Sequence, residues 1–158
     1  MVYGASDLEK INIVERDFVE KARHSSGIVV GGGPAVVRNN VVVGNNDVGI
    51  AREDYGRRGL PRNIVVTHNA IFGNDHGGIL ISSDGPVEAE ISHNAFANRE
   101  GAPLLVAGMV SGDIQFTRSN GSVTPDAPIF EEVNSAQFNV TPIFSLTCPP
   151  LVPARRVP

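Results

Sequence analysis

The sequence predicts an all-β protein, built as a parallel β-solenoid in which short strands wind into stacked coils. The chain has 158 residues, and 17 of them are Gly and 11 Pro. That is too many for a helical bundle, because both residues break helix interiors. A segment of alternating apolar residues that ends in Asn also recurs along the chain, and a Gly-Ile strand follows it. This repeat is the main evidence for a solenoid.

The repeat has three clear copies, in residues 35–45, 64–74 and 89–98, a fainter copy in 114–119 and a degenerate one in 11–18. Three short strands in each unit form one coil. Nothing in the rival architecture, an antiparallel sandwich, demands the same Asn in every unit. The marker positions are Asn40, Asn69, Asn94 and Ser119, spaced by 29, 25 and 25 residues.

The recurring Asn is expected to point inward at a tight bend. Equivalent residues of successive coils stack about 4.8 Å apart, so Asn side chains can bond to one another in a ladder. Asn also tolerates the unusual backbone that such a bend needs, so we expect the Asn itself to adopt it.

The side-chain pattern predicts which residues face the interior of each coil. In the coil that begins at Ile64, the inward residues are Ile64, Val66, Asn69, Ile71, Ile79 and Ile81, and the outward ones are Val65, Thr67, Ala70, Phe72 and Leu80. One outward stripe is apolar, and exposed apolar patches mark interfaces. We therefore predict a homo-oligomer, whereas the alternative is that a terminal segment covers the stripe. The predicted interface residues are Val41, Val43, Val65 and Phe72.

The two ends of the chain are predicted to protect the terminal coils. Residues 1–10 are expected to form an N-terminal cap, with Ser6 or Asp7 starting a short helix. Residues 11–141 form the solenoid, and the Pro-rich segment 142–158 is a tail that cannot pair as a strand. No second domain is predicted.

Composition excludes several classes of partner. The chain has 13 basic and 17 acidic residues, with no basic cluster of the kind that binds nucleic acid. No apolar run is long enough to predict a membrane span. Cys148 is the single cysteine, which excludes an internal disulfide and a cysteine zinc cluster.

The pattern Ile-x-Val-x-x-Asn-x-Ile-x-x-Asn, followed by Gly-Ile-x-Ile, resembles the right-handed parallel β-helix repeat of pectin-lyase-like proteins. The resemblance covers residues 11–133 and implies a right-handed solenoid of about five coils. It also implies an extracellular or periplasmic protein that binds or processes a polysaccharide, as a lyase, hydrolase or epimerase. The alternative is a non-catalytic structural or assembly module, or a truncated fragment, that oligomerises through its apolar outer face.

The resemblance also implies where a polysaccharide would bind. Family members bind it along the outer face of the Gly-Ile strands, which here carries Val29, Ala51, Leu80 and Leu105. The longest loop that follows such a strand is residues 52–62, and long loops often carry function. Charged and aromatic side chains of these loops are candidate ligands for uronate carboxylates. The predicted substrate-binding residues are Arg52, Tyr55, Arg57, Arg58 and Arg99.

Stacking of the loops predicts a candidate catalytic column made of Asp47, His76 and Glu100, with Asp75 beside it. Neighbours in a column are expected to be roughly 5 Å apart. A His between two carboxylates is suited to general acid or base work, and carboxylates about 10 Å apart suit an inverting hydrolase. The alternative is that these residues are ordinary turn chemistry.

No cofactor or metal is predicted. Calcium stays open as a ligand, although the clustered Asp residues of calcium-dependent pectate lyases are not evident and no motif supports it. His68 and His93 form a further column at the Asn bend. Two such residues can bind a transition metal, but no third ligand is obvious. They are expected to be solvated or interface residues.

Overall fold

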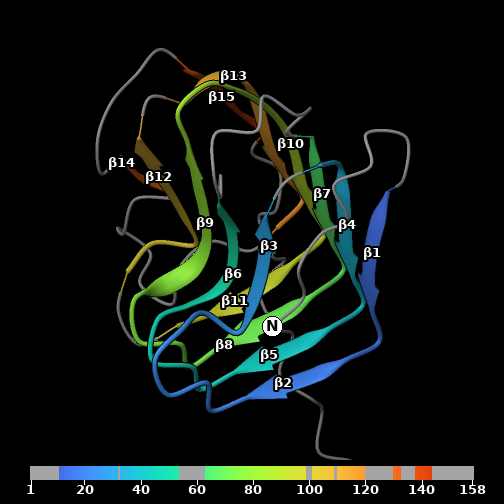
Figure 1. Ribbon diagram of the computed structural model, residues 1–158, viewed down its shortest axis with the longest axis vertical. Helices are drawn as coiled ribbons and strands as arrows, with labels where there is room; N and C mark the ends of the chain where they lie inside the picture. Colours follow the sequence, from blue (N-terminus) through green and yellow to red (C-terminus); the bar gives the residue numbers. More distant parts are fainter. Residues whose placement is uncertain are drawn as a thin grey trace, which may run out of the picture.

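The computed structural model describes residues 11–31, 33–53, 63–98, 101–108 and 110–119, and the backbone of strands at 130–132 and 138–143. These residues form three parallel sheets (Figure 1). Sheet A contains β1 (Asn12–Glu15), β4 (Ala35–Arg38), β7 (Ile64–Thr67), β10 (Pro86–Ser92), β13 (Ser111–Thr117) and β15 (Phe138–Ile143). Sheet B contains β2 (Phe18–Glu20), β5 (Val41–Val43), β8 (Ala70–Phe72) and β11 (Ala95–Ala97). Sheet C contains β3 (Ile28–Gly31), β6 (Val48–Glu53), β9 (Gly77–Ser83), β12 (Leu104–Gly108) and β14 (Phe130–Glu132).

The chain passes from sheet A to sheet B to sheet C in each coil, and then returns to sheet A. Every strand pairs in parallel with the equivalent strand of the next coil, so β4 pairs with β7 and β7 with β10. The sheets stack into about four turns, where about five coils were predicted. In Figure 1, sheet B lies below, sheet A to the right and sheet C to the left of a shared interior. The predicted parallel solenoid is confirmed.

The interior is filled by aliphatic side chains, as the alternation predicts. In the coil that begins at Ile64, all six residues predicted to face inward are buried, and the five predicted to face outward are half-buried or exposed. Two aromatic residues, Phe96 and Phe116, also belong to this core. Their rings stack with the centroids 5.9 Å apart. Burial of these apolar surfaces is the main stabilising term of the coil.

The predicted Asn ladder runs through the bend between sheets A and B. Asn40 Nδ2 donates to Asn69 Oδ1 at 3.0 Å, and Asn69 Nδ2 donates to Asn94 Oδ1 at 2.9 Å. Each side-chain oxygen also accepts from the backbone N–H of the preceding ladder residue. Ser119 continues the ladder, since its hydroxyl accepts from Asn94 N at 3.1 Å. The ladder thus satisfies buried polar groups that would otherwise be costly.

A second ladder lies at the bend between sheets B and C, in the column of Asn45, Asn74 and Asn98. Asn45 Nδ2 donates to Asn74 Oδ1 at 2.8 Å, and Asn74 Nδ2 donates to Asn98 Oδ1 at 3.2 Å. This ladder explains Gly27 and Gly49, which precede Ile28 and Ile50. A Cβ atom at Gly49 would lie 2.9 Å from Asn74 Nδ2 and 2.5 Å from Ile71 Cγ2. Only Gly leaves room for the ladder at this position.

The left-handed backbone at the first bend belongs to the residue before the ladder Asn, so the expectation that the Asn adopts it is wrong. The five residues concerned form one column, which we call the corner column. Left-handed backbone is unfavourable for residues other than Gly. Here the Asn side chain is needed inside for the ladder, and its neighbour takes the strained position outside. The corner column consists of Arg16, Asn39, His68, His93 and Arg118, with φ between 48° and 62°.

The end of the solenoid lies slightly beyond the predicted boundary at residue 141. Strand β15 continues to Ile143, and Pro142 pairs with Phe116 of β13. A Pro is compatible with a strand at the edge of a sheet, and β15 is the last strand of sheet A in the described residues. The predicted cap at residues 1–10 and the remainder of the tail lie outside the described residues.

The first ladder predicts a large loss of stability for Asn69→Ala. This change removes the acceptor of the Asn40 N–H and the donor to the Val37 carbonyl, which are both buried. We expect the free energy of unfolding to fall by about 2–4 kcal/mol in urea denaturation. The control Asn46→Ala removes an exposed hydrogen bond and should change it by no more than about 0.5 kcal/mol. Equal losses in both variants would contradict the ladder's role.

Candidate functional site

The groove expected over sheet C is closed in part. Its floor residues do lie in one outward column, because Val29 pairs with Ala51 and Ala51 with Leu80. However, Val29 is 4% exposed and Ala51 0%, and both belong to a second apolar cluster with Val48. Leu80 and Leu105 pack partly buried against this cluster. A polysaccharide therefore cannot lie on Val29 and Ala51, and the prediction of an open floor there is wrong.

Arg52 points into the solenoid, although it was predicted to bind substrate. It pairs in register with Val30 and Ile81, which are both core residues, and it is itself only 1% exposed. Its Nη1 donates to the Glu53 carbonyl at 2.5 Å. Strand alternation explains this position, since Ala51 faces outward and the next residue must face inward. The other predicted substrate and catalytic residues of the loops, Tyr55, Arg57, Arg58, Arg99 and Glu100, lie outside the described residues.

Two residues of the predicted catalytic column are in contact. The ring nitrogen Nδ1 of His76 lies 3.3 Å from Asp47 Oδ1. The backbone N–H of His76 also donates to the backbone carbonyl of Asp47. The hydroxyl of Ser26 donates to the other Asp47 oxygen at 2.9 Å. The side chains of His76 and Asp47 are 67% and 41% exposed. A carboxylate that holds one imidazole nitrogen leaves the other to exchange a proton with a ligand. Asp75 lies in the adjacent column, and its N–H donates to the Asn45 carbonyl.

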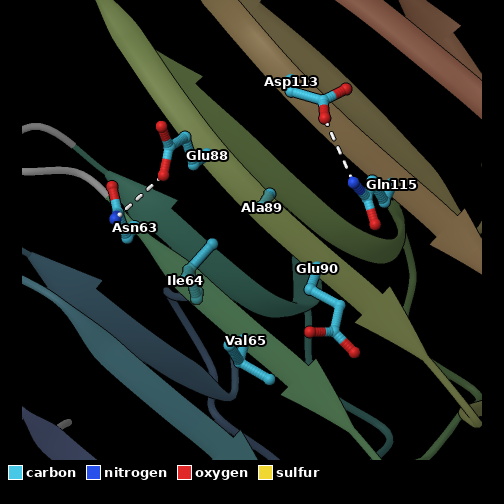
Figure 2. Close-up of a pocket in the computed structure, with 8 residues that line it drawn as sticks. All are labelled: Asn63, Ile64, Val65, Glu88, Ala89, Glu90, Asp113 and Gln115. Carbon is cyan, nitrogen blue, oxygen red and sulfur yellow. Dashed lines mark hydrogen bonds between the residues drawn. The ribbon is translucent and has the colours of Figure 1, made fainter.

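A polar groove that the sequence analysis missed lies on the outer face of sheet A. It has a volume of about 310 Å³ and crosses β7, β10 and β13 (Figure 2). Strand register builds it, because Glu88 pairs with Asp113 and Glu90 with Gln115. The alternation Glu-x-Glu, followed 25 residues later by Asp-x-Gln, is the sequence signal that could have revealed it. The lining residues are Asn63, Ile64, Val65, Glu88, Ala89, Glu90, Asp113 and Gln115.

Neighbouring side chains hold the three carboxylates of this groove in place. Asn63 Nδ2 donates to Glu88 Oε2 at 3.1 Å, and Gln115 Nε2 donates to Asp113 Oδ2 at 3.1 Å. Glu90 Oε1 accepts from the hydroxyl of Ser92 at 3.2 Å. In Figure 2, Asn63 and Glu88 lie on one side of Ala89, and Asp113 and Gln115 lie on the other. A carboxylate has two oxygens, so each can accept a further hydrogen bond from a ligand.

The predicted apolar stripe faces outward, mainly on sheet B. Phe72 is 39% exposed, and Val41, Val43 and Val65 are half-buried. Phe18, which the sequence analysis did not include, pairs with Val41 and is 65% exposed. The stripe thus has the expected orientation, and association of copies through it stays a prediction. In the described parts of the chain, no helix has the length and hydropathy to cross a membrane.

Comparison with protein families agrees with this architecture. The family model described as a right handed beta helix region matches residues 3–120. Because the match covers most of the chain, the protein belongs to this family of right-handed β-helices. No curated protein and no solved structure matches the chain significantly. Within the described residues, no group of three or more His, Cys, Asp or Glu side chains is arranged to hold a metal.

The buried position of Arg52 predicts a structural role. Arg52→Ala would leave a cavity between Val30 and Ile81, and we expect the free energy of unfolding to fall by about 2–4 kcal/mol. The control is Arg38→Ala, which removes an exposed ion pair with Glu15 and should cost at most about 1 kcal/mol. Thermal and urea denaturation measure both. If Arg52→Ala lowers the free energy of unfolding no more than Arg38→Ala does, the buried position of the Arg52 guanidinium is contradicted.

Proposed function

We propose that this β-helix binds a neutral polysaccharide on the outer face of sheet A. The observation that carries the proposal is the groove of about 310 Å³, lined by carboxylates and amides at Asn63, Glu88, Glu90, Asp113 and Gln115. Carboxylates accept hydrogen bonds from sugar hydroxyls, and amide groups both donate and accept them. These side chains are exposed, and a ligand can reach them without any rearrangement of the coil.

The charges of the groove favour a neutral polysaccharide over an acidic one. Glu88, Glu90 and Asp113 are three carboxylates on adjacent positions of two paired strands. A uronate polymer would bring like charges next to them, which disfavours binding. Arg52, the one described member of the arginines expected to bind uronates, is buried away from this surface. The charges of the groove therefore support a neutral polysaccharide, in place of the uronates to which the loop arginines were assigned.

The repeat of the solenoid suits a linear polymer that lies across the strands. Equivalent residues follow one another at about 4.8 Å, which is comparable with the width of one sugar ring. Beyond Glu90, the same column continues through Val65, Val36 and Ile13. Ile13 is 56% exposed, so this column offers apolar contacts to the faces of further sugars. One ligand could therefore use the hydrogen bonds of the groove and the apolar column together.

The groove predicts how binding responds to loss of its charges. We expect soluble neutral polysaccharides to bind the full chain in affinity electrophoresis, and polyuronates to bind weakly or not at all. Glu88→Gln and Asp113→Asn should each weaken binding about ten-fold, because a hydrogen bond to a charged group contributes about 1.5–3 kcal/mol. The control Glu20→Gln lies on sheet B and should bind as the wild type does. Unchanged binding in both groove variants, or preference for polyuronates, would refute the proposal.

A second candidate function is acid–base processing of a polysaccharide at Asp47 and His76, favoured by their 3.3 Å contact. We expect mass spectrometry of products from a polysaccharide panel to show fragments that lack water for a lyase, or that gained water for a hydrolase. His76→Ala and Asp47→Asn should lower such activity at least 100-fold, which is typical for loss of a general acid or base. Stability should change by at most about 1 kcal/mol, because the pair is exposed. Activity that survives in both variants would exclude this pair.

A further inference from the structure

We propose that His68 and His93 form a binding site for a divalent transition-metal ion, of the class Cu²⁺, Ni²⁺ or Zn²⁺. Both residues belong to the corner column, and both are exposed. Their imidazole rings are stacked, with the centroids 4.8 Å apart and the planes within 5° of parallel. Neither imidazole lines the groove proposed for polysaccharide or takes part in the Asp47–His76 contact.

A chain of hydrogen bonds fixes the proton of His68. Glu90 Oε1 accepts from the Ser92 hydroxyl, which uses the single proton of Ser92. The 3.2 Å contact between Ser92 and Thr67 must then be donated by Thr67. Thr67 has no proton left, so its 2.8 Å contact with His68 Nδ1 must be donated by the ring. Neutral His68 therefore carries its proton on Nδ1, and its Nε2 lone pair is available.

This arrangement is the one that metal-binding imidazoles use. Neutral imidazole is the most common metal ligand in proteins, and its second ring nitrogen usually donates to an oxygen that orients it. His68 has that support from Thr67, Ser92 and Glu90. The carboxylate of Glu90 at the end of the chain also favours a cation bound to the ring.

The stacked rings need only a small movement to share one ion. Metal–nitrogen distances of about 2.0–2.1 Å bring two ligand atoms to about 3 Å from each other. The ring edges must therefore tilt together from their 4.8 Å stack, and exposed side chains can do so without disturbing the core. Water would complete the coordination. Among these ions, Cu²⁺ should bind most tightly.

The charged neighbours restrict the ion to the space between the two rings. Arg118 follows His93 in the corner column and repels a cation on that side, whereas the uncharged Asn39 precedes His68. Arg38, which is in register with Thr67, is paired with Glu15 at 2.6 Å. A shared site between His68 and His93 thus lies one coil away from the guanidinium of Arg118.

Titration of the full chain with Cu²⁺, followed by calorimetry and electron paramagnetic resonance, tests the proposal. We expect one equivalent to bind with nitrogen ligands, and the affinity to fall at least ten-fold in His68→Ala and in His93→Ala. The control His24→Ala, another exposed histidine, should bind as the wild type does. Circular dichroism establishes that each variant is folded, with His68→Gln and His93→Gln as substitutes for a variant that is not. Wild-type affinity in both variants would overturn the proposal.

The hydrogen-bond chain gives an independent test. Thr67→Val keeps the branched shape of the side chain but removes the acceptor of His68 Nδ1, and it should weaken Cu²⁺ binding about ten-fold, as is usual for such supporting groups. Nitrogen NMR of the metal-free protein should show the Nδ1–H form of His68, and Zn²⁺ should shift its Nε2 resonance. Observation of the Nε2–H form, or a Zn²⁺ response confined to His24 and His76, would refute the assigned geometry.

Discussion

The register between successive coils is the constraint on which the rest of the structure depends. Each strand pairs in parallel with the equivalent strand of the next coil, so every residue has a counterpart about one strand spacing away. The two Asn ladders fix this register at two bends, because a shift by one residue would remove both buried hydrogen bonds of each rung. Core packing alone excludes a shift by one residue but not a shift by two, which keeps the same face inside and exchanges Ile and Val positions that are nearly interchangeable.

The same register converts short sequence motifs into surfaces. A residue that faces outward in one coil has outward-facing counterparts in the coils before and after it. Similar residues at equivalent positions therefore become a stripe, such as the stacked pair of His68 and His93, or the apolar face that contains Phe72. Different residues at equivalent positions become a mixed site, such as the groove around Glu88 and Asp113. A binding surface in this architecture is therefore built from residues at equivalent positions of successive coils, and not from one continuous sequence motif.

The fold could be predicted from the sequence because the spacing of the repeat gives the register between successive coils. The spacing of Asn40, Asn69 and Asn94 predicted the ladder, and alternation predicted the inward and outward faces of each strand. It also predicted the contact of Asp47 with His76, since loops that track the strands keep their register. Loop contacts beyond this depend on residues that have no counterpart in neighbouring coils.

The candidate site was harder to predict for three physical reasons. Arg52 was assigned to a loop by its charge, although alternation from Ala51 directs it inward. The floor at Val29 was expected to be open, but the solvent exposure of an outward apolar residue depends on what packs over it, and a strand pattern carries no such information. The groove on sheet A was missed because Glu88 and Asp113 read as solvated charges until their strands are paired.

Glu90 connects the two surfaces for which binding is proposed. One of its oxygens accepts the hydrogen bond from Ser92 that orients His68, and the same carboxylate lines the groove on sheet A. A ligand hydroxyl that binds Glu90 would share its negative charge with the Ser92 hydroxyl and weaken the support of the imidazole. A metal ion at His68 would draw electron density from Glu90 through the same hydrogen bonds, and would make Glu90 a weaker acceptor for a ligand hydroxyl. By linkage, the two ligands must then affect each other's affinity equally, and the coupling passes through Ser92 and Thr67.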